Sequence, residues 1–257
     1  MSSNPDAFKK RPTGVDLFAG AGGMSLGFEQ AGFDVVAAVE IDPVHAAVHH
    51  FNFPQSTILA YSVAEVTGES IRKAANLGAE PIDCVFGGAP CQGFSMIGKR
   101  VLEDPRNALV RHFVRLVDEL DARSFVFENV KGLTVGRHRV FVDELVDTFE
   151  KLGFVVQMPY KVLNAANYGV PQSRERFFLI GSREGENLPV YPSASTSFGK
   201  ITNKDLPPAP NWAARMKAKA TPGRVEWPTV SLRRERLRKR RKQPQIPAAS
   251  PRELTPR

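Results

Sequence analysis

The sequence GGAPCQGFS, residues 87–95, follows a short apolar run, Ile82–Phe86, that is typical of a strand buried in a parallel sheet. Such a strand places the Cys91 thiol on a loop at the carboxyl edge of the sheet, where open α/β sheets bind their ligands. The two glycines permit close backbone approach, and Pro90 fixes φ just before the cysteine. Packing in the core, the usual fate of a free cysteine, suits Cys84 inside the apolar run. We therefore expect Cys91 to carry chemistry.

The opening of the chain has the pattern of a nucleotide-binding βαβ unit. An apolar run, Val15–Phe18, ends in the glycine-rich turn 19–23, and the helical stretch Met24–Ala31 follows. Glycines let the backbone approach a ligand, and a helix N-terminus favours a carboxylate or phosphate. The next strand, Asp34–Val39, ends at Glu40, and an acidic residue about 20 positions past such a turn binds a ribose diol. A surface glutamate ahead of a helix is the alternative interpretation of Glu40.

The strand expected at Ser124–Phe127 runs directly into Glu128 and Asn129. The carboxyl ends of neighbouring parallel strands meet at one edge of a sheet, so Glu128 is expected beside the cysteine loop. A carboxyl group in that position is suited to donate or accept a proton. An ordinary glutamate at a strand end is the alternative, and the position beside Cys91 favours the acid.

Glutamine and arginine residues alternate ahead of the strand expected at Phe177–Ile180. Because side chains of an extended chain point alternately to its two faces, Gln172, Arg174 and Arg176 are expected to share a face. An arginine in such a row is suited to bidentate binding of a phosphate or a carbonyl oxygen. A solvated strand face is the alternative, and it fits Glu175 best.

Five patterns follow one another in the order found in the DNA cytosine-5 methyltransferases, and the chain resembles that family. They are the Phe-x-Gly-x-Gly turn from Phe18, Glu40, Pro-Cys-Gln at 90–92, Glu-Asn-Val at 128–130 and Gln-x-Arg-x-Arg at 172–176. They span residues 15–181, about two-thirds of the chain. The resemblance implies an α/β fold with a Rossmann-like, doubly wound, mostly parallel sheet, the class I S-adenosylmethionine-dependent methyltransferase fold. In that fold the strand at 177–180 runs antiparallel to its neighbours.

The resemblance also implies a reaction, the transfer of a methyl group from S-adenosylmethionine to C5 of a cytosine flipped out of double-stranded DNA. Cys91 would bond covalently to C6, and a protonated Glu128 would donate to N3. Arg176 would hold the cytosine O2 and orient Glu128, while Arg174 would brace the loop or touch phosphate. The remaining residues expected at the substrate are Gln92, Ser95, Asn129 and Gln172.

The implied cofactor site surrounds the glycine-rich turn, where Phe18 would stack on adenine, Glu40 would take the ribose hydroxyls and Ile41 would line the adenine pocket. The full set of implied cofactor residues is Phe18, Ala19, Gly20, Gly22, Gly23, Leu26, Glu40, Ile41, Ser62, Val63, Pro90 and Leu109. Residues 61–63 are Tyr-Ser-Val where the family usually has Gly-Asp-Ile, and a serine cannot accept from the adenine amino group as a carboxylate does. We expect weaker cofactor binding, or another group in place of the carboxylate.

Composition predicts a protein of the cell interior without a metal centre. Hydrophobic residues make up 42% of the 257 residues and charged residues 24%, as in ordinary globular proteins. Two cysteines without a C-x-x-C pair argue against zinc and against a disulfide scaffold. His45 and His49 lie one helical turn apart, but no third ligand accompanies them. No apolar run reaches the ~18 residues of a membrane span, so a cytoplasmic, DNA-associated protein is expected.

The net charge of +8 arises at the end of the chain. Residues 231–257 hold ten Lys or Arg and two Asp or Glu, whereas residues 1–230 hold 25 of each sign. Such a run is usually disordered and can grip DNA phosphates without sequence preference, and a shifted reading frame is the alternative origin. The expected division is a disordered leader at 1–13, a methyltransferase catalytic domain at 14–185, the start of a target-recognition region or a linker at 186–230, and a disordered basic tail at 231–257.

Two segments that the resemblance implies are not found after Gly181. One is an Arg-rich helix-forming segment, and the other is a C-terminal segment around Gly-Asn that completes the cofactor pocket. Three hypotheses follow: a catalytic subunit whose second chain carries the recognition region and these segments, a truncated inactive remnant that binds only cofactor or DNA, and, as a distant alternative, methylation of cytosine in RNA. The first, within a restriction–modification system, is the function we expect.

Overall fold

A computed structural model of the chain describes residues 10–90, 107–136, 139–199 and 205–209. These residues all belong to one unit of the chain, Met1–Pro210. Cys91, Gln92 and Ser95 lie outside the described residues, as does the basic segment 231–257. No helix in the described part of the chain is long and apolar enough to cross a membrane.

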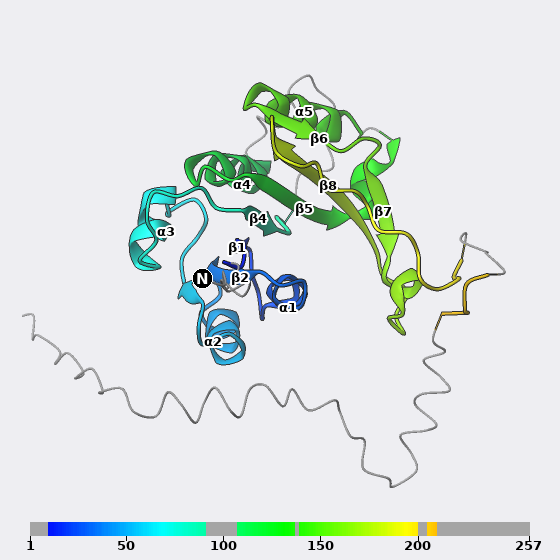
Figure 1. The fold of residues 1–257 in the computed structure, drawn as a ribbon, viewed down its shortest axis with the longest axis horizontal. Coiled ribbons are helices and arrows are strands. Elements are labelled where there is room, and N and C mark those ends of the chain that lie inside the picture. The colour runs from blue at the N-terminus through cyan, green and yellow to red at the C-terminus, as the bar shows by residue number, and fades with distance from the viewer. Residues whose placement is uncertain (1–9, 91–106, 137–138, 200–204, 210–257) are drawn as a thin grey trace, which may run out of the picture. The chain divides into compact units, whose positions relative to one another are not determined.

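Strands and helices alternate through most of this unit (Figure 1). The strands are β1 (Thr13–Leu17), β2 (Asp34–Val39), β3 (Thr57–Leu59), β4 (Cys84–Gly87), β5 (Ser124–Val130), β6 (Phe154–Val156), β7 (Lys161–Asn164) and β8 (Glu175–Arg183). The α-helices are α1 (Gly23–Gln30), α2 (Pro43–Asn52), α3 (Gly68–Ala74), α4 (Ala108–Glu119) and α5 (Arg139–Lys151). Two short 3-10 helices are η3 (Lys131–Thr134) and η5 (Ala165–Tyr168).

The strands form one sheet in the order β3-β2-β1-β4-β5-β8-β6, and β7 also pairs with β8. The pairs from β3 through to β5 are parallel, and the chain crosses over between them through helices. Strand β8 lies antiparallel to β5, β6 and β7. The expected Rossmann-like sheet with one antiparallel strand is therefore confirmed.

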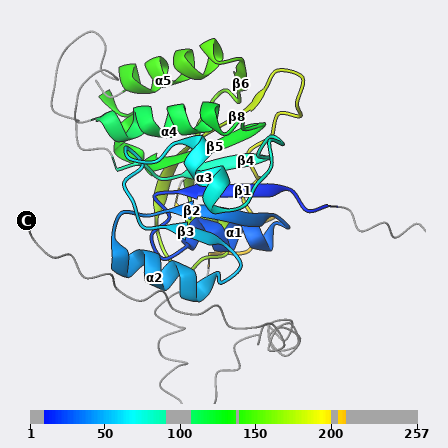
Figure 2. The same ribbon diagram turned by 90° about the vertical axis from the view of Figure 1, so that its left-hand side faces the viewer.

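One face of the sheet is covered by α3, α4 and α5 and holds the larger hydrophobic cluster. Strand residues of this cluster include Leu17, Val85, Phe125 and Phe127, and helix residues include Ile71, Phe113 and Phe149, all fully buried. The rings of Phe125 and Phe149 stack with centroids 3.7 Å apart. Figure 2 shows α3 and α4 lying across this face. Along each strand, side chains that point to this face alternate with side chains that point to the opposite face, as expected of a sheet.

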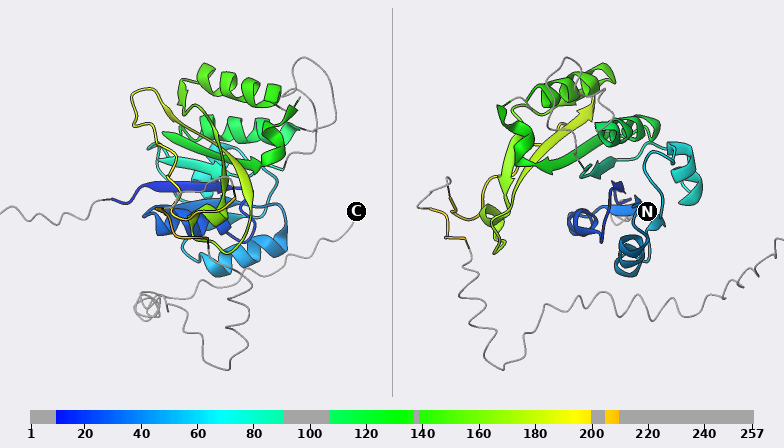
Figure 3. Two further views of the ribbon diagram at one scale, coloured as in Figure 1. Left: turned by 90° about the vertical axis from the view of Figure 1, so that its right-hand side faces the viewer. Right: turned by 180° about the vertical axis from the view of Figure 1, so that it is seen from behind.

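The opposite face carries α1, with α2 beside it. Helices α1 and α3 lie on opposite sides of β1 and β2 in Figures 1 and 3. The start of α2 is set by Asp42, whose carboxylate accepts from the backbone N–H groups of Val44 (2.8 Å) and His45 (3.1 Å), with Pro43 as the first helical residue. This cap fixes how the chain turns from Glu40, at the end of β2, into α2.

The residue pattern predicts a helix over residues 66–81 and a single strand over residues 154–163, and both differ from the structure. The helix expected over residues 66–81 is confined to α3, because the chain turns after Ala74 and the Arg72 guanidinium donates to the carbonyls of Gly78 (2.7 Å) and Glu80 (2.9 Å). The strand expected over residues 154–163 is two strands, β6 and β7, separated by a segment that contains Pro159. Proline has no N–H for a ladder hydrogen bond, so it marks the interruption.

Strands β1 and β4 approach each other closely at Leu17 and Gly87. A Cβ atom on Gly87 would lie 2.1 Å from the carbonyl oxygen of Leu17, which is backbone and cannot move aside. We predict that Gly87→Ala forces these strands apart and lowers the free energy of unfolding by roughly 1–3 kcal/mol. Gly132→Ala, at a site where a Cβ would meet nothing within 4 Å, is the matched control. Urea denaturation that gives equal stabilities for the two variants would contradict the close approach.

Candidate active site

A row of paired residues crosses the sheet just before its carboxyl edge. Leu17 pairs with Val39 on one side and with Gly87 on the other, Gly87 pairs with Phe127, and Phe127 pairs with Leu179. The residues that follow this row on β1, β2, β4 and β5 are Phe18, Glu40, Gly88 and Glu128. Four motifs that are far apart in the sequence therefore leave the sheet side by side at one edge.

The glycine-rich turn after β1 is bound to the end of β2 through Glu40. The backbone N–H of Gly20 donates to Glu40 Oε2 over 2.8 Å, and the N–H of Asp42 donates to Oε1 over 2.9 Å. Phe18, at φ 62°, has a left-handed backbone conformation that is costly for a bulky residue. The buried Glu40 side chain thus holds the turn in place, and its oxygens keep further lone pairs for a ligand.

Helix α2 and Phe53, the residue that follows it, pack against the same turn. Gly22 has φ 93°, and a Cβ there would lie 2.1 Å from the Phe53 ring and 3.0 Å from the His49 ring. Asn52 Nδ2 donates to the carbonyl of Ala21 over 3.0 Å. Only glycine satisfies both the backbone conformation and the contact at position 22. The conformation of the turn is therefore set by α2 as well as by β2.

A buried polar network that the sequence analysis missed lies beneath the turn. Ser25 Oγ donates to Asp16 Oδ2 over 2.6 Å and lies 3.0 Å from His49 Nε2, and all three side chains are fully or almost fully buried. Burial raises the pKa of the Asp16 carboxyl to about 7, against the lowering effect of the hydrogen bonds from Ser25. Burial also lowers the pKa of His49. The network joins β1, α1 and α2 behind the glycines.

The other residues expected at the cofactor fall into exposed and covered groups. Leu26 and Ile41 are apolar side chains exposed to 51% and 68% of their full surface. Gly23, the first residue of α1, and Pro90, after β4, are exposed as well. Ala19 and Val63 are buried, and Leu109 packs partly against the larger core. Ser62 Oγ accepts from the backbone N–H of Ala64 over 3.2 Å, so the hydroxyl forms a local turn.

The Glu128 carboxyl group lies between β8 and the loop that leads to Cys91. Arg176 Nε lies 3.0 Å from Glu128 Oε1, and the two side chains are 24% and 20% exposed. A Cβ on Gly88 would lie 2.8 Å from Glu128 Oε2, so the carboxyl group rests against that residue. Burial raises the pKa of Glu128, although Arg176 and Arg174 favour its charged form. The carboxyl group is therefore both paired and partly desolvated.

The neighbouring Asn129 secures the same loop. Its Nδ2 donates to the carbonyl of Ala89 over 2.9 Å, and its side chain is buried. Together Glu128 and Asn129 contact Gly88 and Ala89, which precede Pro90 and Cys91 in the chain. The described part of the loop is thus fixed to the end of β5.

We expected Gln172, Arg174 and Arg176 to share one face of an extended strand, and this is wrong for two of the three residues. Strand β8 begins at Glu175, so only Arg176 belongs to it, and Gln172 and Arg174 are exposed in the segment before it. The backbone of Arg174 is bound at both ends, because its N–H donates to Asn164 Oδ1 over 3.1 Å and its carbonyl accepts from Ala165. This pairing with η5 and the end of β7 makes a loop where the sequence indicated a strand.

We predict that the free energy of unfolding of Asp16→Asn increases, relative to that of the wild-type protein, as the pH rises. The unfolded Asp16 ionises near pH 4 whereas the native carboxyl stays protonated up to about pH 7, so the wild-type protein loses stability across this window and the variant does not. From pH 5 to pH 8, the stability of the variant should rise relative to wild type by roughly 2–3 kcal/mol in urea denaturation. Asp143→Asn, at an exposed aspartate, is the control. A stability difference between Asp16→Asn and wild type that is the same at pH 5 and pH 8 would contradict the raised pKa.

Comparisons with known proteins agree with this arrangement. The family described as "C-5 cytosine-specific DNA methylase" matches residues 13–245. The chain is 58% identical over 201 residues to Type II methyltransferase M.XorII of Xanthomonas oryzae pv. oryzae, an alignment that covers 77% of this chain and 47% of the relative. It is 40% identical to Type II methyltransferase M.AquIA of Picosynechococcus sp., covering 68% of this chain and 73% of that one.

A solved structure of a methyltransferase is similar as well. A putative DNA modification methyltransferase encoded within an Escherichia coli prophage superimposes with a TM-score of 0.59 at 36% identity, covering 67% of this chain and 47% of the other. The chain thus spans about half the length of M.XorII and of this structure. The match to most of the chain, together with the convergent strand ends, places the protein in the family of C-5 cytosine-specific DNA methylases.

Proposed function

We propose that this chain is the catalytic part of a DNA cytosine-5 methyltransferase that uses Cys91 as its nucleophile. The observation that carries the proposal is the position of Glu128, which is paired with Arg176 and rests against Gly88, three residues before Cys91. A carboxyl group, a guanidinium and a cysteine loop at one sheet edge are the groups that activation of a cytosine ring requires. The relatives' names as Type II methyltransferases favour a role in a restriction–modification system.

The residues at the glycine-rich turn fit S-adenosylmethionine. Phe18 and Gly22 have left-handed backbone conformations in this turn, and the Glu40 carboxylate that accepts from the N–H of Gly20 suits the two hydroxyls of a ribose. Phe18 and the exposed Ile41 offer apolar surface to an adenine ring. When bound, the cofactor supplies an electrophilic methyl group on a sulfonium sulfur. Ser62 offers no carboxylate to the adenine amino group, so we expect the contacts of Phe18 and Glu40 to carry most of the affinity.

The chain's own residues would activate the cytosine. The Cys91 thiolate adds to C6 of the ring, and the electron pair of the C5–C6 double bond shifts so that C5 becomes nucleophilic. A protonated Glu128 donates to N3 and relieves the negative charge on the ring. Arg176 holds Glu128 and would contact the cytosine O2. Once C5 carries the methyl group, a base removes the C5 proton and Cys91 leaves by elimination.

The substrate proposed is double-stranded DNA from which the target cytosine is flipped, because a base inside the duplex cannot reach a loop at the sheet edge. Asn129 and Gln172 belong to the proposed substrate surface with Gln92 and Ser95, and Arg174 is exposed near Glu128 and suits a phosphate. The basic segment 231–257 would add contacts to phosphates that do not depend on base sequence.

We further propose that a second chain carries the recognition region and the remaining motifs. The chain covers 47% of M.XorII but 73% of M.AquIA, so a family member of nearly the same length as this chain exists. In this proposal Cys91, Glu128 and the cofactor turn of this chain would carry the chemistry, and residues of the second chain would read the bases. The target sequence would then depend on that second chain.

The test is transfer of a labelled methyl group from S-adenosylmethionine to cytosine in unmethylated DNA. We expect the chain to need a second chain with the missing segments, and Cys91→Ala to abolish transfer by the complex. Activity retained by Cys91→Ala would overturn the nucleophile. Binding of cofactor without transfer in any combination would mean an inactive remnant, and transfer to RNA instead of DNA would reassign the substrate.

We predict that Glu128→Gln lowers the methylation rate of the active complex by about 10²-fold or more while DNA binding is retained, because the glutamine cannot deliver a proton. In the unsubstituted protein the methylation rate should fall as the pH rises through the raised pKa of Glu128. This decrease in rate should be absent in the variant. Glu175→Gln, at an exposed carboxylate that pairs with Lys131 over 2.8 Å, is the control. An unaltered rate in Glu128→Gln would remove the acid from the mechanism.

A further inference from the structure

The chain forms a turn after β3, residues 61–65, at the cofactor edge of the sheet. Leu59, the last residue of β3, pairs with Val39 of β2, and its carbonyl accepts from the N–H of Glu40 over 3.1 Å. The residues that follow Leu59 therefore leave the sheet beside Glu40 and Ile41. A base attached to a ribose at Glu40 would lie against the β3 turn.

The β3 turn offers apolar surface where such a base would lie. Ile41 and Tyr61 each follow the register pair of Val39 and Leu59 by two residues, so they occupy matching positions at adjacent strand ends. Both side chains are more than half exposed. Large apolar side chains in such positions are suited to pack on a flat aromatic base.

Residues 62–65 close the β3 turn by their own hydrogen bonds. The N–H of Ser62 donates to Glu65 Oε2 over 3.1 Å, and that of Ala64 donates to Ser62 Oγ over 3.2 Å. The N–H of Glu65 donates to the Ser62 carbonyl over 2.9 Å. Among the described residues, none accepts from the N–H of Val63, although this residue is buried. Backbone donors of buried residues are almost always paired, so this one is suited to a ligand.

Helix α4 holds the β3 turn in position through its carbonyl groups. Arg115 Nη2 donates to the carbonyls of Val63 over 2.8 Å and Val66 over 3.0 Å. Arg115 is itself paired with Glu119, whose Oε2 accepts from the N–H of Gly68 over 2.7 Å. The Val63 peptide is therefore fixed before any ligand binds.

The Glu65 carboxylate supplies an acceptor beside this donor. Its Oε2 is bound to the Ser62 N–H, whereas its Oε1 accepts from no residue that the structure describes, and the side chain is exposed. The turn thus offers an N–H donor at Val63 and a carboxylate oxygen at Glu65. The Watson–Crick edge of adenine has the complementary pair, because its N1 accepts and its N6 amino group donates a hydrogen bond.

We propose that Glu65 selects the adenine base of the cofactor by accepting from the N6 amino group, while the N–H of Val63 donates to N1. The inference rests on the proposed function, which takes S-adenosylmethionine as the cofactor. The carboxylate stands three residues after Ser62, where the family usually has aspartate. A base with an oxygen in place of the amino group would be rejected, because that oxygen would face the carboxylate and its N1–H would face the Val63 donor.

The test compares the binding of S-adenosylhomocysteine and of the same compound with hypoxanthine in place of adenine. Both are titrated by calorimetry into the full chain, alone and mixed with the part of M.XorII that lies outside the alignment. We expect the unsubstituted chain to prefer adenine by about tenfold or more, and Glu65→Gln to reduce this preference to about threefold or less. The glutamine oxygen can still accept from the Ser62 N–H, so the turn is kept while the amide N–H₂ faces the adenine amino group.

Two further variants separate the charge of Glu65 from its place in the turn. Glu69→Gln, at an exposed glutamate in the first turn of α3, is the matched control and should keep the preference. Ser62→Asp combined with Glu65→Gln supplies a carboxylate where the family usually has one, and it should restore the preference.

The outcomes distinguish this inference from the proposed function. An adenine preference that Glu65→Gln leaves unchanged would overturn the role of Glu65 and leave the cofactor standing. Failure of the unsubstituted chain to bind either compound, alone or in the mixture, would overturn this inference and the cofactor together. A preference that Glu65→Gln removes, without methylation of DNA by the mixture, would support the role of Glu65 and count against the proposed activity.

Discussion

The close approach of β1 and β4 at Leu17 and Gly87 is the constraint on which the site depends. Because these residues are register partners with almost no space between them, the turn that begins at Phe18 and the loop that begins at Gly88 leave the sheet from adjacent positions. The same row continues to Phe127, and so Glu128 emerges next to Gly88. A glycine at one strand end thus brings a cofactor-type turn, a carboxyl group and the cysteine loop to one edge.

Buried polar groups stabilise this edge by fixing loops instead of filling the core. Glu40 accepts from two backbone N–H groups, and Asn129 donates to the loop after β4, so each side chain replaces hydrogen bonds that a strand ladder can no longer provide. Glu128 is partly desolvated against Gly88 and is held by Arg176. The burial that raises the pKa of this carboxyl and the contacts that hold the loop arise from one arrangement.

The parts of the fold that follow from local pattern were predictable from the sequence. Apolar runs that end in Gly-rich or acidic residues indicated the positions of the parallel strands, and the resemblance to the family implied the sheet type and the antiparallel direction of β8. The Asp16–Ser25–His49 network could not be predicted, because it joins three elements through side-chain directions that periodicity does not specify. A polar residue inside the apolar run of β1 was the available signal. The Gln172–Arg174 row failed because pairing with Asn164 and Ala165, which is tertiary, keeps that segment out of β8.

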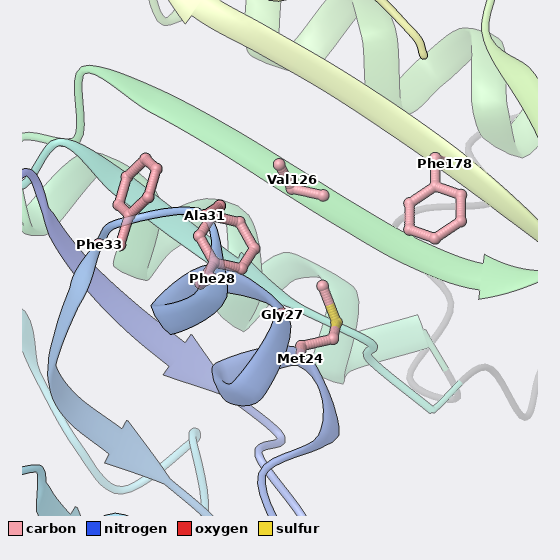
Figure 4. A pocket seen from close by; sticks show the side chains of 7 residues that line it. All are labelled: Met24, Gly27, Phe28, Ala31, Phe33, Val126 and Phe178. Carbon is pink, nitrogen blue, oxygen red and sulfur yellow. The ribbon is translucent and has the colours of Figure 1, made fainter. Parts of the chain in front are cut away.

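Helix α1 directly follows the glycine-rich turn, and its stability depends on tertiary contacts. It has eight residues, no side-chain cap on its first turn and no acidic residue there, so an isolated helix of this length would not persist. On one side Ser25 binds it to Asp16 and His49, and Phe28 stacks on Phe86 with ring centroids 3.6 Å apart. Its remaining side, with Met24 and Phe28, faces Val126 of β5 and Phe178 of β8 across an apolar hollow of about 290 Å³ (Figure 4). The contacts that hold α1 to Asp16, His49 and Phe86 therefore also hold the glycine-rich turn that precedes it, so the conformation of that turn depends on the packing of one short helix.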